Sequence, residues 1–219
     1  MRVLVACEYS ATVRDAFRRR GFDAWSCDIL PTEGDPRWHI QGDAIEAAYG
    51  QHWDLLIAHP PCTYLSRAGA RWWKVPGRDA LAEQAAEFAF RFRDAPAPHI
   101  AIENPIGQLA TRWRKPDQTI QPWEYGHPFS KATCLWLKKL PPLMPTDIYA
   151  NFRPLIRSNV TATKRAGKVQ QGVLSGGLES ARTFPGIAEA MADQWGAFVR
   201  RLADQPITPT LCGGVGMVV

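Results

Sequence analysis

The sequence predicts an α/β fold in which a doubly wound, Rossmann-like parallel sheet carries helices on both faces. Short apolar runs of strand length lie at 3–7, 22–27, 53–59 and 99–103. Stretches with helical spacing of apolar residues separate them, at 11–20, 44–49 and 77–94. Such alternation of strand and helix is typical of parallel sheets, and 219 residues suffice for one domain with a sizeable core.

Two segments between these elements are predicted as loops. Residues 30–43 are rich in Pro, Gly and Asp, and residues 63–76 hold aromatic and basic side chains. Beyond residue 105 the alternation is lost, so residues 106–124 are predicted to be irregular, before a strand at 134–137. A helix from 187 to 202 closes the domain, and the residues near one of its faces are Ile187, Met191, Trp195 and Phe198.

The chain thus divides into a core at 1–137, an inserted region at 138–180, a closing helix at 181–205 and a tail at 206–219. A net charge of +5 and an isoelectric point of about 9.1 favour a polyanionic partner such as nucleic acid. We expect no membrane span, because no apolar run reaches roughly 18 residues. The five cysteines lack zinc-binding spacing, so we expect reduced thiols and no metal.

Side chains that can do chemistry follow the ends of four predicted strands. They are Glu8, Asp28, Cys62 and the pair Glu103-Asn104, with Asp43 at a neighbouring loop end. Ligands of doubly wound sheets bind outside the carboxyl ends of the strands. We therefore expect these side chains to share one site.

Cys62 follows two prolines that end the third strand abruptly. Prolines hold the backbone extended and lack N–H donors, so they present the next side chain rigidly. Alone, this cysteine fits either a buried structural residue or a positioned thiolate nucleophile. An acid at Glu103 would give such a nucleophile a use, because thiolate attack at carbon 6 of cytosine builds negative charge that an acid at ring nitrogen 3 can neutralise.

Three segments together resemble the motifs of DNA cytosine carbon-5 methyltransferases. Pro60-Pro61-Cys62 resembles the family's nucleophile motif, and Glu103-Asn104-Pro105 its acid motif. Residues 125–137 resemble its Tyr-Gly-x-Pro segment, in which two arginines help to hold the flipped base and the active-site acid. Lys131 falls on the first arginine and Thr133 on the second. Residues 184–192 resemble the last conserved segment, whose helix packs beside the donor site.

The resemblance implies a Rossmann-like S-adenosylmethionine-dependent methyltransferase fold with a small recognition region at 138–180. It implies catalytic roles for Cys62, Glu103, Asn104 and Lys131. Asp28 corresponds to the acid that binds the donor's ribose, and Asp43 to the one that binds its adenine amino group. The turn after the first strand has small residues but lacks the family's glycines. The implied donor-binding residues are Cys7, Glu8, Tyr9, Ser10, Asp28, Ile29, Asp43 and Pro60.

A compact, phage-like member of this family would transfer a methyl group from S-adenosylmethionine to a cytosine flipped out of double-stranded DNA, through a covalent Cys62 adduct. No metal is implied. We expect a monomer, in the cytosol of a bacterium or of a phage-infected host. The Trp72-Trp73 pair either closes the site on the base or anchors its loop in the core. Candidate phosphate contacts are Arg67, Arg71, Lys74, Arg153, Arg157, Lys164, Arg165 and Lys168.

Other interpretations are open at this point. An amino methyltransferase would have an aromatic after Pro-Pro, where this chain has Cys62, and an Asp, Asn or Ser before it, where this chain has His59. A carbon-5 enzyme for RNA or free pyrimidine nucleotides fits the same residues. So do a non-catalytic relative that binds nucleic acid and an enzyme that uses a modified donor with a larger group.

Overall fold

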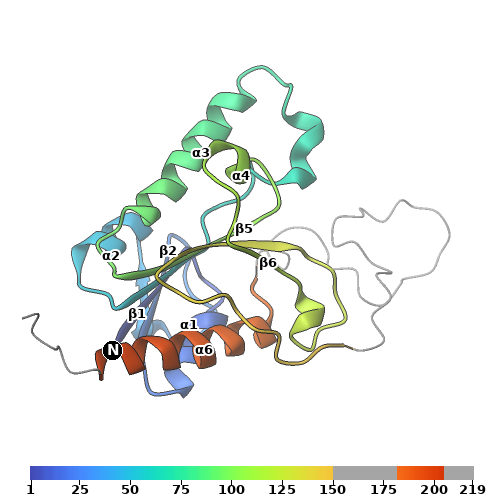
Figure 1. Ribbon diagram of the computed structural model, residues 1–219. Coiled ribbons are helices and arrows are strands. Elements are labelled where there is room, and N and C mark those ends of the chain that lie inside the picture. The colour runs from blue at the N-terminus through green and yellow to red at the C-terminus, as the bar shows by residue number, and fades with distance from the viewer. Residues whose placement is uncertain (150–181, 205–219) are drawn as a thin grey trace, which may run out of the picture.

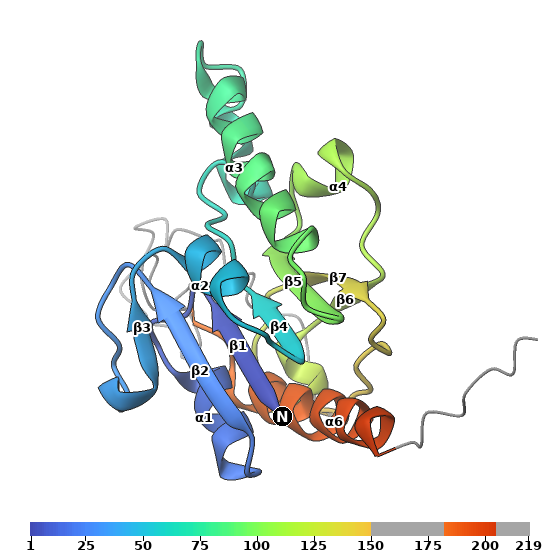
Figure 2. The same cartoon turned by 90° about the vertical axis from the view of Figure 1, so that its left-hand side faces the viewer.

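The computed structural model describes residues 1–149 and 182–204. Within them, seven strands form one sheet in the order β3-β2-β1-β4-β5-β7-β6 (Figures 1 and 2). The parallel strands are β1 (Arg2–Ala6), β2 (Asp23–Asp28), β3 (His39–Gln41), β4 (Leu55–Ala58) and β5 (His99–Pro105). β7 (Thr133–Lys138) runs antiparallel to both of its neighbours, β5 and β6 (Gln118–Ile120), so β6 points in the same direction as the parallel strands. The doubly wound α/β fold is confirmed, and this strand order with β7 reversed is that of the Rossmann-like methyltransferase fold.

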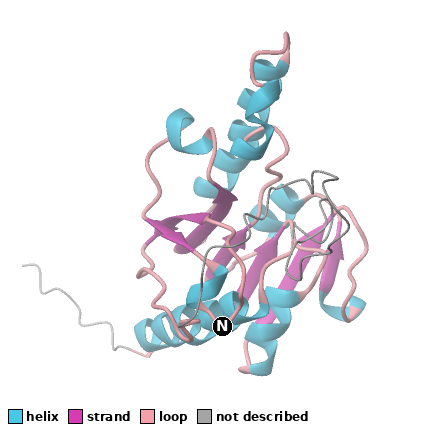
Figure 3. Cartoon of the chain, turned by 90° about the vertical axis from the view of Figure 1, so that its right-hand side faces the viewer, coloured by secondary structure: helices cyan, strands magenta, loops and turns pink. Residues whose placement is uncertain are grey.

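Helices cover both faces of the sheet (Figure 3). On one face lie α2 (Ala44–Gly50), α3 (Arg78–Arg93) and the short α4 (Leu109–Arg112); on the other lie α1 (Thr12–Arg19) and α6 (Pro185–Ala203). Successive strand residues point to opposite faces. In β1, Leu4 therefore packs in the core with α2 and α3, whereas Val5 packs in the core with α1 and α6.

The predicted closing helix is confirmed as α6. Ile187, Met191 and Trp195 are buried on the face that meets the sheet and α1, while Phe198 is half-buried with its ring edge-on to His99. Arg20, at the end of α1, pairs with Glu189 and Asp193 of α6. The first and last helices of the described chain thus close the same side of the sheet.

The two predicted loops and the segment predicted to be irregular all contain regular structure, so those predictions are wrong in part. Residues 30–43 include the 3-10 helix Pro36–Trp38 and β3, and residues 63–76 include the 3-10 helix Arg67–Trp72. Residues 106–124 include α4, β6 and the 3-10 helix Pro122–Glu124. Three-residue strands such as β3 and β6 are too short for an apolar pattern, and pairing with β2 and β7 holds them in the sheet.

The predicted inserted region is described only at its beginning. Residues up to 149 run back along the core: buried Leu143 exchanges two hydrogen bonds with Gln118 of β6, and Met144 exchanges two with Gln194 of α6. Residues 150–180 and the tail at 206–219 lie outside the described residues, as do Arg153, Arg157, Lys164, Arg165 and Lys168. Among the described helices, none is both long enough and apolar enough to cross a membrane.

Candidate active site

A cavity of about 920 Å³ opens at the carboxyl ends of β1, β2, β3, β4 and β5. This volume is typical of sites that enclose a small-molecule ligand. The cavity is lined by every side chain that the sequence singled out for donor binding or catalysis: Cys7, Glu8, Tyr9, Ser10, Asp28, Ile29, Asp43, Pro60, Cys62, Glu103, Asn104 and Lys131. His59, Phe88 and Arg182 also line it.

The turn from β1 to α1 takes left-handed backbone conformations without glycine. Cys7 has φ 59° and Ala11 has φ 61°, in the region that glycine adopts most readily. Between them, the buried Glu8 side chain accepts hydrogen bonds from the amide nitrogens of Val13 (2.6 Å) and Arg14 (3.1 Å). Glu8 therefore holds the first turn of α1, a role that the sequence did not reveal.

Burial raises the pKa of Glu8 above its usual value, against the lowering effects of positive charge on His59 and of the two amide hydrogen bonds. A buried carboxyl with a raised pKa holds its proton at higher pH than a solvated one. The hydrogen bonds from Val13 and Arg14 nevertheless hold the Glu8 carboxyl at the floor of the cavity.

Asp28 and Asp43 occupy the ends of β2 and of the loop before α2. Asp28 Oδ1 accepts from the amide of Leu30 at 3.0 Å, and Asp43 Oδ1 accepts from the amide of Ile45 at 2.6 Å as the N-cap of α2. Both hydrogen bonds use Oδ1, and both residues line the cavity. The two carboxylates on one rim of a large cavity fit a donor with a ribose and an adenine amino group, as S-adenosylmethionine has.

Cys62 lies at the other end of the cavity, directly after Pro61. The backbone carbonyl of Cys62 accepts from the amides of Leu65 (3.0 Å) and Ser66 (2.8 Å), which closes a turn around it. The Asn104 amide nitrogen donates to the carbonyl of Pro60 at 2.9 Å and so ties the Pro-Pro segment to β5. Burial raises the pKa of the Cys62 thiol, as does the charge of Glu103, whereas Lys131 lowers it.

Glu103, at the end of β5, is held by side chains from two other strands. Its Oε2 lies 3.0 Å from His59 Nδ1, and the Thr133 hydroxyl also hydrogen-bonds to its carboxylate. Burial raises the pKa of Glu103, but the hydrogen bond and charge of His59, with Lys131 and Thr133, bring it below its usual value. Sequence reasoning missed His59 as a site residue.

One signal could have found His59. In the parallel register, Ala58 of β4 pairs with Ile102 of β5, so the next residues of the two strands, His59 and Glu103, emerge side by side. Both are the last residues of the segments that predicted their strands, 53–59 and 99–103. Aligning the carboxyl ends of the predicted strands would therefore have placed the two residues together.

The Tyr-Gly-x-Pro segment packs against the start of α6. Tyr125 is buried, and His127 Nε2 accepts from the amide of Gly186 at 2.9 Å. A Cβ on Gly186 would lie 2.0 Å from the Tyr125 carbonyl oxygen, so only glycine allows this close approach. The segment thereby directs Lys131 to the cavity, where its ammonium also donates to the Arg182 carbonyl at 3.4 Å.

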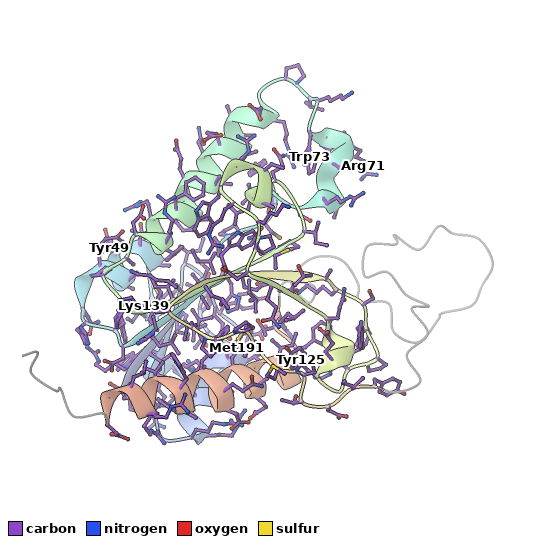
Figure 4. All side chains as sticks on the ribbon, viewed as in Figure 1. Tyr49, Arg71, Trp73, Tyr125, Lys139 and Met191 are labelled. Carbon is purple, nitrogen blue, oxygen red and sulfur yellow. The ribbon has the colours of Figure 1, made fainter. Side chains whose placement is uncertain are left out.

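The basic 3-10 helix after Cys62 projects from the domain beside α3, where Figure 4 labels Arg71 and Trp73. Arg67, Arg71 and Lys74 are exposed, and the Arg71 guanidinium lies over the Trp72 ring. Trp72 is 49% exposed and Trp73 is half-buried. Trp72 does not anchor this segment in the core, so its ring can meet a partner.

In residues 1–149 and 182–204, no group of three or more His, Cys, Asp or Glu side chains is placed to hold a metal ion. No protein-family model and no curated protein matches the chain.

Three solved structures with some likeness to the chain are described as nucleic-acid methyltransferases. The first, described as a candidate DNA modification methyltransferase encoded within a prophage (Escherichia coli), is 16% identical with a TM-score of 0.43 over 68% of this chain. An Escherichia coli rRNA methylase and a 16S rRNA methylase are each 16% identical over 63% of this chain, with TM-scores of 0.37 and 0.33.

The chain spans 51% of the length of the first structure and 57% and 55% of the other two. At this level of similarity their activities are not carried over to this chain. The fold assignment therefore rests on the strand order and on the direction of β7.

Proposed function

We propose that this protein transfers a methyl group from S-adenosylmethionine to carbon 5 of cytosine in DNA, with Cys62 as the nucleophile. One observation supports this most: Cys62, Glu103 and Lys131, from three separate parts of the chain, line the same cavity as Asp28 and Asp43. A thiol, an acid and a cation at one end of a cavity, with ribose- and adenine-binding carboxylates at the other, match the needs of this reaction.

In the proposed reaction, the target cytosine is flipped out of the duplex and enters the Cys62 end of the cavity. The Cys62 thiolate adds to carbon 6 while Glu103 protonates ring nitrogen 3, which makes carbon 5 nucleophilic. The bound donor supplies an electrophilic methyl group. Loss of the carbon-5 proton to a base then breaks the bond between sulfur and carbon 6. Lys131 favours the Cys62 thiolate, which begins the reaction, because its charge lowers the pKa of the Cys62 thiol.

The first test measures the product. The protein is incubated with S-adenosylmethionine and mixed-sequence duplex DNA, and in parallel with RNA of the same sequence and with free cytidine nucleotides. Nucleosides are then identified by mass spectrometry. We expect 5-methylcytosine in the DNA arm, its absence with Cys62→Ala, and its retention with Cys27→Ala, which removes a buried thiol that does not line the cavity.

A second test traps the intermediate. Fluorine at carbon 5 cannot leave as a proton, so duplex DNA with 5-fluorocytosine should remain covalently attached to Cys62 after methyl transfer. Peptide mass spectrometry should locate the attachment at Cys62. Methylation of another base, or a fully active Cys62→Ala protein, contradicts the nucleophile assignment. If 5-methylcytosine forms only with RNA or with free nucleotides, the proposed reaction stands but its substrate is not DNA.

A further inference from the structure

Two aspartates account for two of the three polar parts of the proposed donor. S-adenosylmethionine consists of adenine, ribose and a methionyl group whose α-carbon carries an ammonium and a carboxylate. Asp28 and Asp43 fit the ribose and the adenine amino group, and both line the cavity. A carboxylate enclosed in a cavity loses water and needs N–H groups or a positive charge in its place. The carboxylate of the donor therefore requires a group that neither aspartate can supply.

The start of α1 is already occupied, although helix starts commonly bind anions. The amides of Val13 and Arg14 in its first turn donate to the buried Glu8 carboxyl at 2.6 and 3.1 Å. The Thr12 amide donates to the Ser10 hydroxyl at 3.4 Å. A second carboxylate placed here would face Glu8 and would find these N–H groups in use.

Among the described residues, the lysine and arginine side chains that line the cavity are Lys131 and Arg182. Lys131 lies near the Cys62 end, where its charge lowers the pKa of the Cys62 thiol. The Arg182 guanidinium reaches the turn after β1 and the loop after β2. Its Nη2 donates to Glu33 Oε1 at 2.5 Å, and it also hydrogen-bonds to the Tyr9 side chain. The amide of Glu33 donates to the Tyr9 carbonyl at 2.9 Å, so these contacts form one cluster.

Arg182 also lies between the two ends of the cavity. Its carbonyl accepts from the Lys131 ammonium at 3.4 Å, while its guanidinium reaches Tyr9 and Glu33. The methionyl group of the donor must lie in this interval, because adenosine occupies the end with the aspartates while the methyl group faces the base at Cys62. A guanidinium has five N–H groups in a planar fork that fits a carboxylate. Its contacts with Glu33 and Tyr9 do not use all five.

We propose that the Arg182 guanidinium binds the α-carboxylate of S-adenosylmethionine, and that Glu33 holds this guanidinium in place from outside the cavity. This inference rests on the proposed function, because it adds the methionyl end to the proposed donor site. The Arg182 side chain is 44% exposed, so without Glu33 it would keep its charge but sample more rotamers. Arg182 thus contacts the ligand, whereas Glu33 is a positioning residue.

The test measures ligand affinity by calorimetry, with the full chain and without nucleic acid. The ligands are S-adenosylmethionine and its decarboxylated form, which keeps the adenosine, sulfonium and ammonium. We expect wild type to bind S-adenosylmethionine about 10–100-fold more tightly, since hydrogen bonds between charged groups are among the strong ones. In Arg182→Met this preference should fall below about threefold. Affinity for the decarboxylated form should stay within about threefold of wild type, which also shows that the variant is folded.

Two further variants separate recognition of the carboxylate from support of the loop. Glu33→Gln leaves the charge of Arg182 in place, so the preference should remain above about fivefold. The matched control is Arg37→Met, which removes an exposed arginine that pairs with Asp35 outside the cavity, and it should match wild type. The assignment is overturned if wild type shows no preference or if the preference survives in Arg182→Met. It is also overturned if Arg182→Met weakens both ligands equally, or if Glu33→Gln abolishes the preference as fully as Arg182→Met does.

Methylation of DNA by the same variants is measured separately. A preference that depends on Arg182, without any 5-methylcytosine, keeps the carboxylate site and refutes the proposed function. Formation of 5-methylcytosine, with a preference that Arg182→Met leaves unchanged, keeps the proposed function and overturns the carboxylate site. If wild type binds neither ligand, both are overturned.

Discussion

The two ends of the cavity hold their carboxylates in different ways. At the end formed by β1, β2 and β3, Glu8, Asp28 and Asp43 accept hydrogen bonds from backbone amides at most six residues away along the chain. At the end formed by β4, β5 and β7, Glu103 meets His59 and Asn104 meets Pro60, each across 44 residues. Local turns thus build the proposed donor end, whereas contacts between strands build the proposed reaction end.

The largest expected difference between the two ends lies in catalysis. Glu103→Gln should lower the single-turnover methylation rate by about 10²–10⁴-fold, because an amide cannot protonate nitrogen 3. Donor affinity, measured by calorimetry, should stay within about threefold of wild type. Asp28→Asn should do the reverse and weaken donor binding by about tenfold, since it removes a charged acceptor. If Glu103→Gln weakens only donor binding, the assignment of separate donor and reaction ends is wrong.

The two buried carboxyls should also give opposite dependences of stability on pH. The folded-state pKa of Glu8 is raised, so its contribution to stability is present below the unfolded value of 4.5 and is lost as pH rises through the raised value. The folded-state pKa of Glu103 is lowered, so its contribution is present above 4.5 and is lost as pH falls.

Urea unfolding at several pH values checks this contrast. Relative to wild type, Glu8→Gln should gain stability as pH rises above 4.5, with a slope of at most about 1.4 kcal/mol per pH unit. Glu103→Gln should gain relative stability as pH falls below 4.5. Parallel curves for the two variants would show that the ends do not differ in this respect.

A smaller effect concerns the reactivity of Cys62. Lys131→Met removes the charge that lowers the pKa of this thiol, so alkylation of Cys62 by iodoacetamide at pH 8 should slow by about 3–10-fold. Peptide mass spectrometry follows Cys62 separately from the other thiols. Lys139→Met changes an exposed lysine outside the cavity and should leave the rate unchanged. Equal slowing in both variants would point to an effect of net charge alone.

The smallest effect is expected in the turn between β1 and α1. In Ala11→Gly, relief of the left-handed conformation at φ 61° favours folding by about 1 kcal/mol, and the loss of a buried methyl group opposes it by about 0.8 kcal/mol. The net change in the free energy of unfolding should stay within about 0.5 kcal/mol. A loss above 2 kcal/mol would show that the methyl contacts dominate.

Much of the fold could be predicted from the sequence, because β1, β2, β4 and β5 are apolar runs and α1, α3 and α6 carry their own periodicity. Short β3 and β6 have no such signal and exist through pairing with a neighbour. At the site, motifs predicted which residues line the cavity, but not their contacts. The capping role of Glu8 and the partnership of His59 with Glu103 arise from geometry that no motif records.

The pairing of Ala58 with Ile102 fixes which side chains lie next to each other in this cavity. Adding or deleting one residue in β4 or β5 would turn every following side chain to the opposite face. The lengths of β4 and β5 therefore decide whether the His59 and Glu103 side chains meet at all.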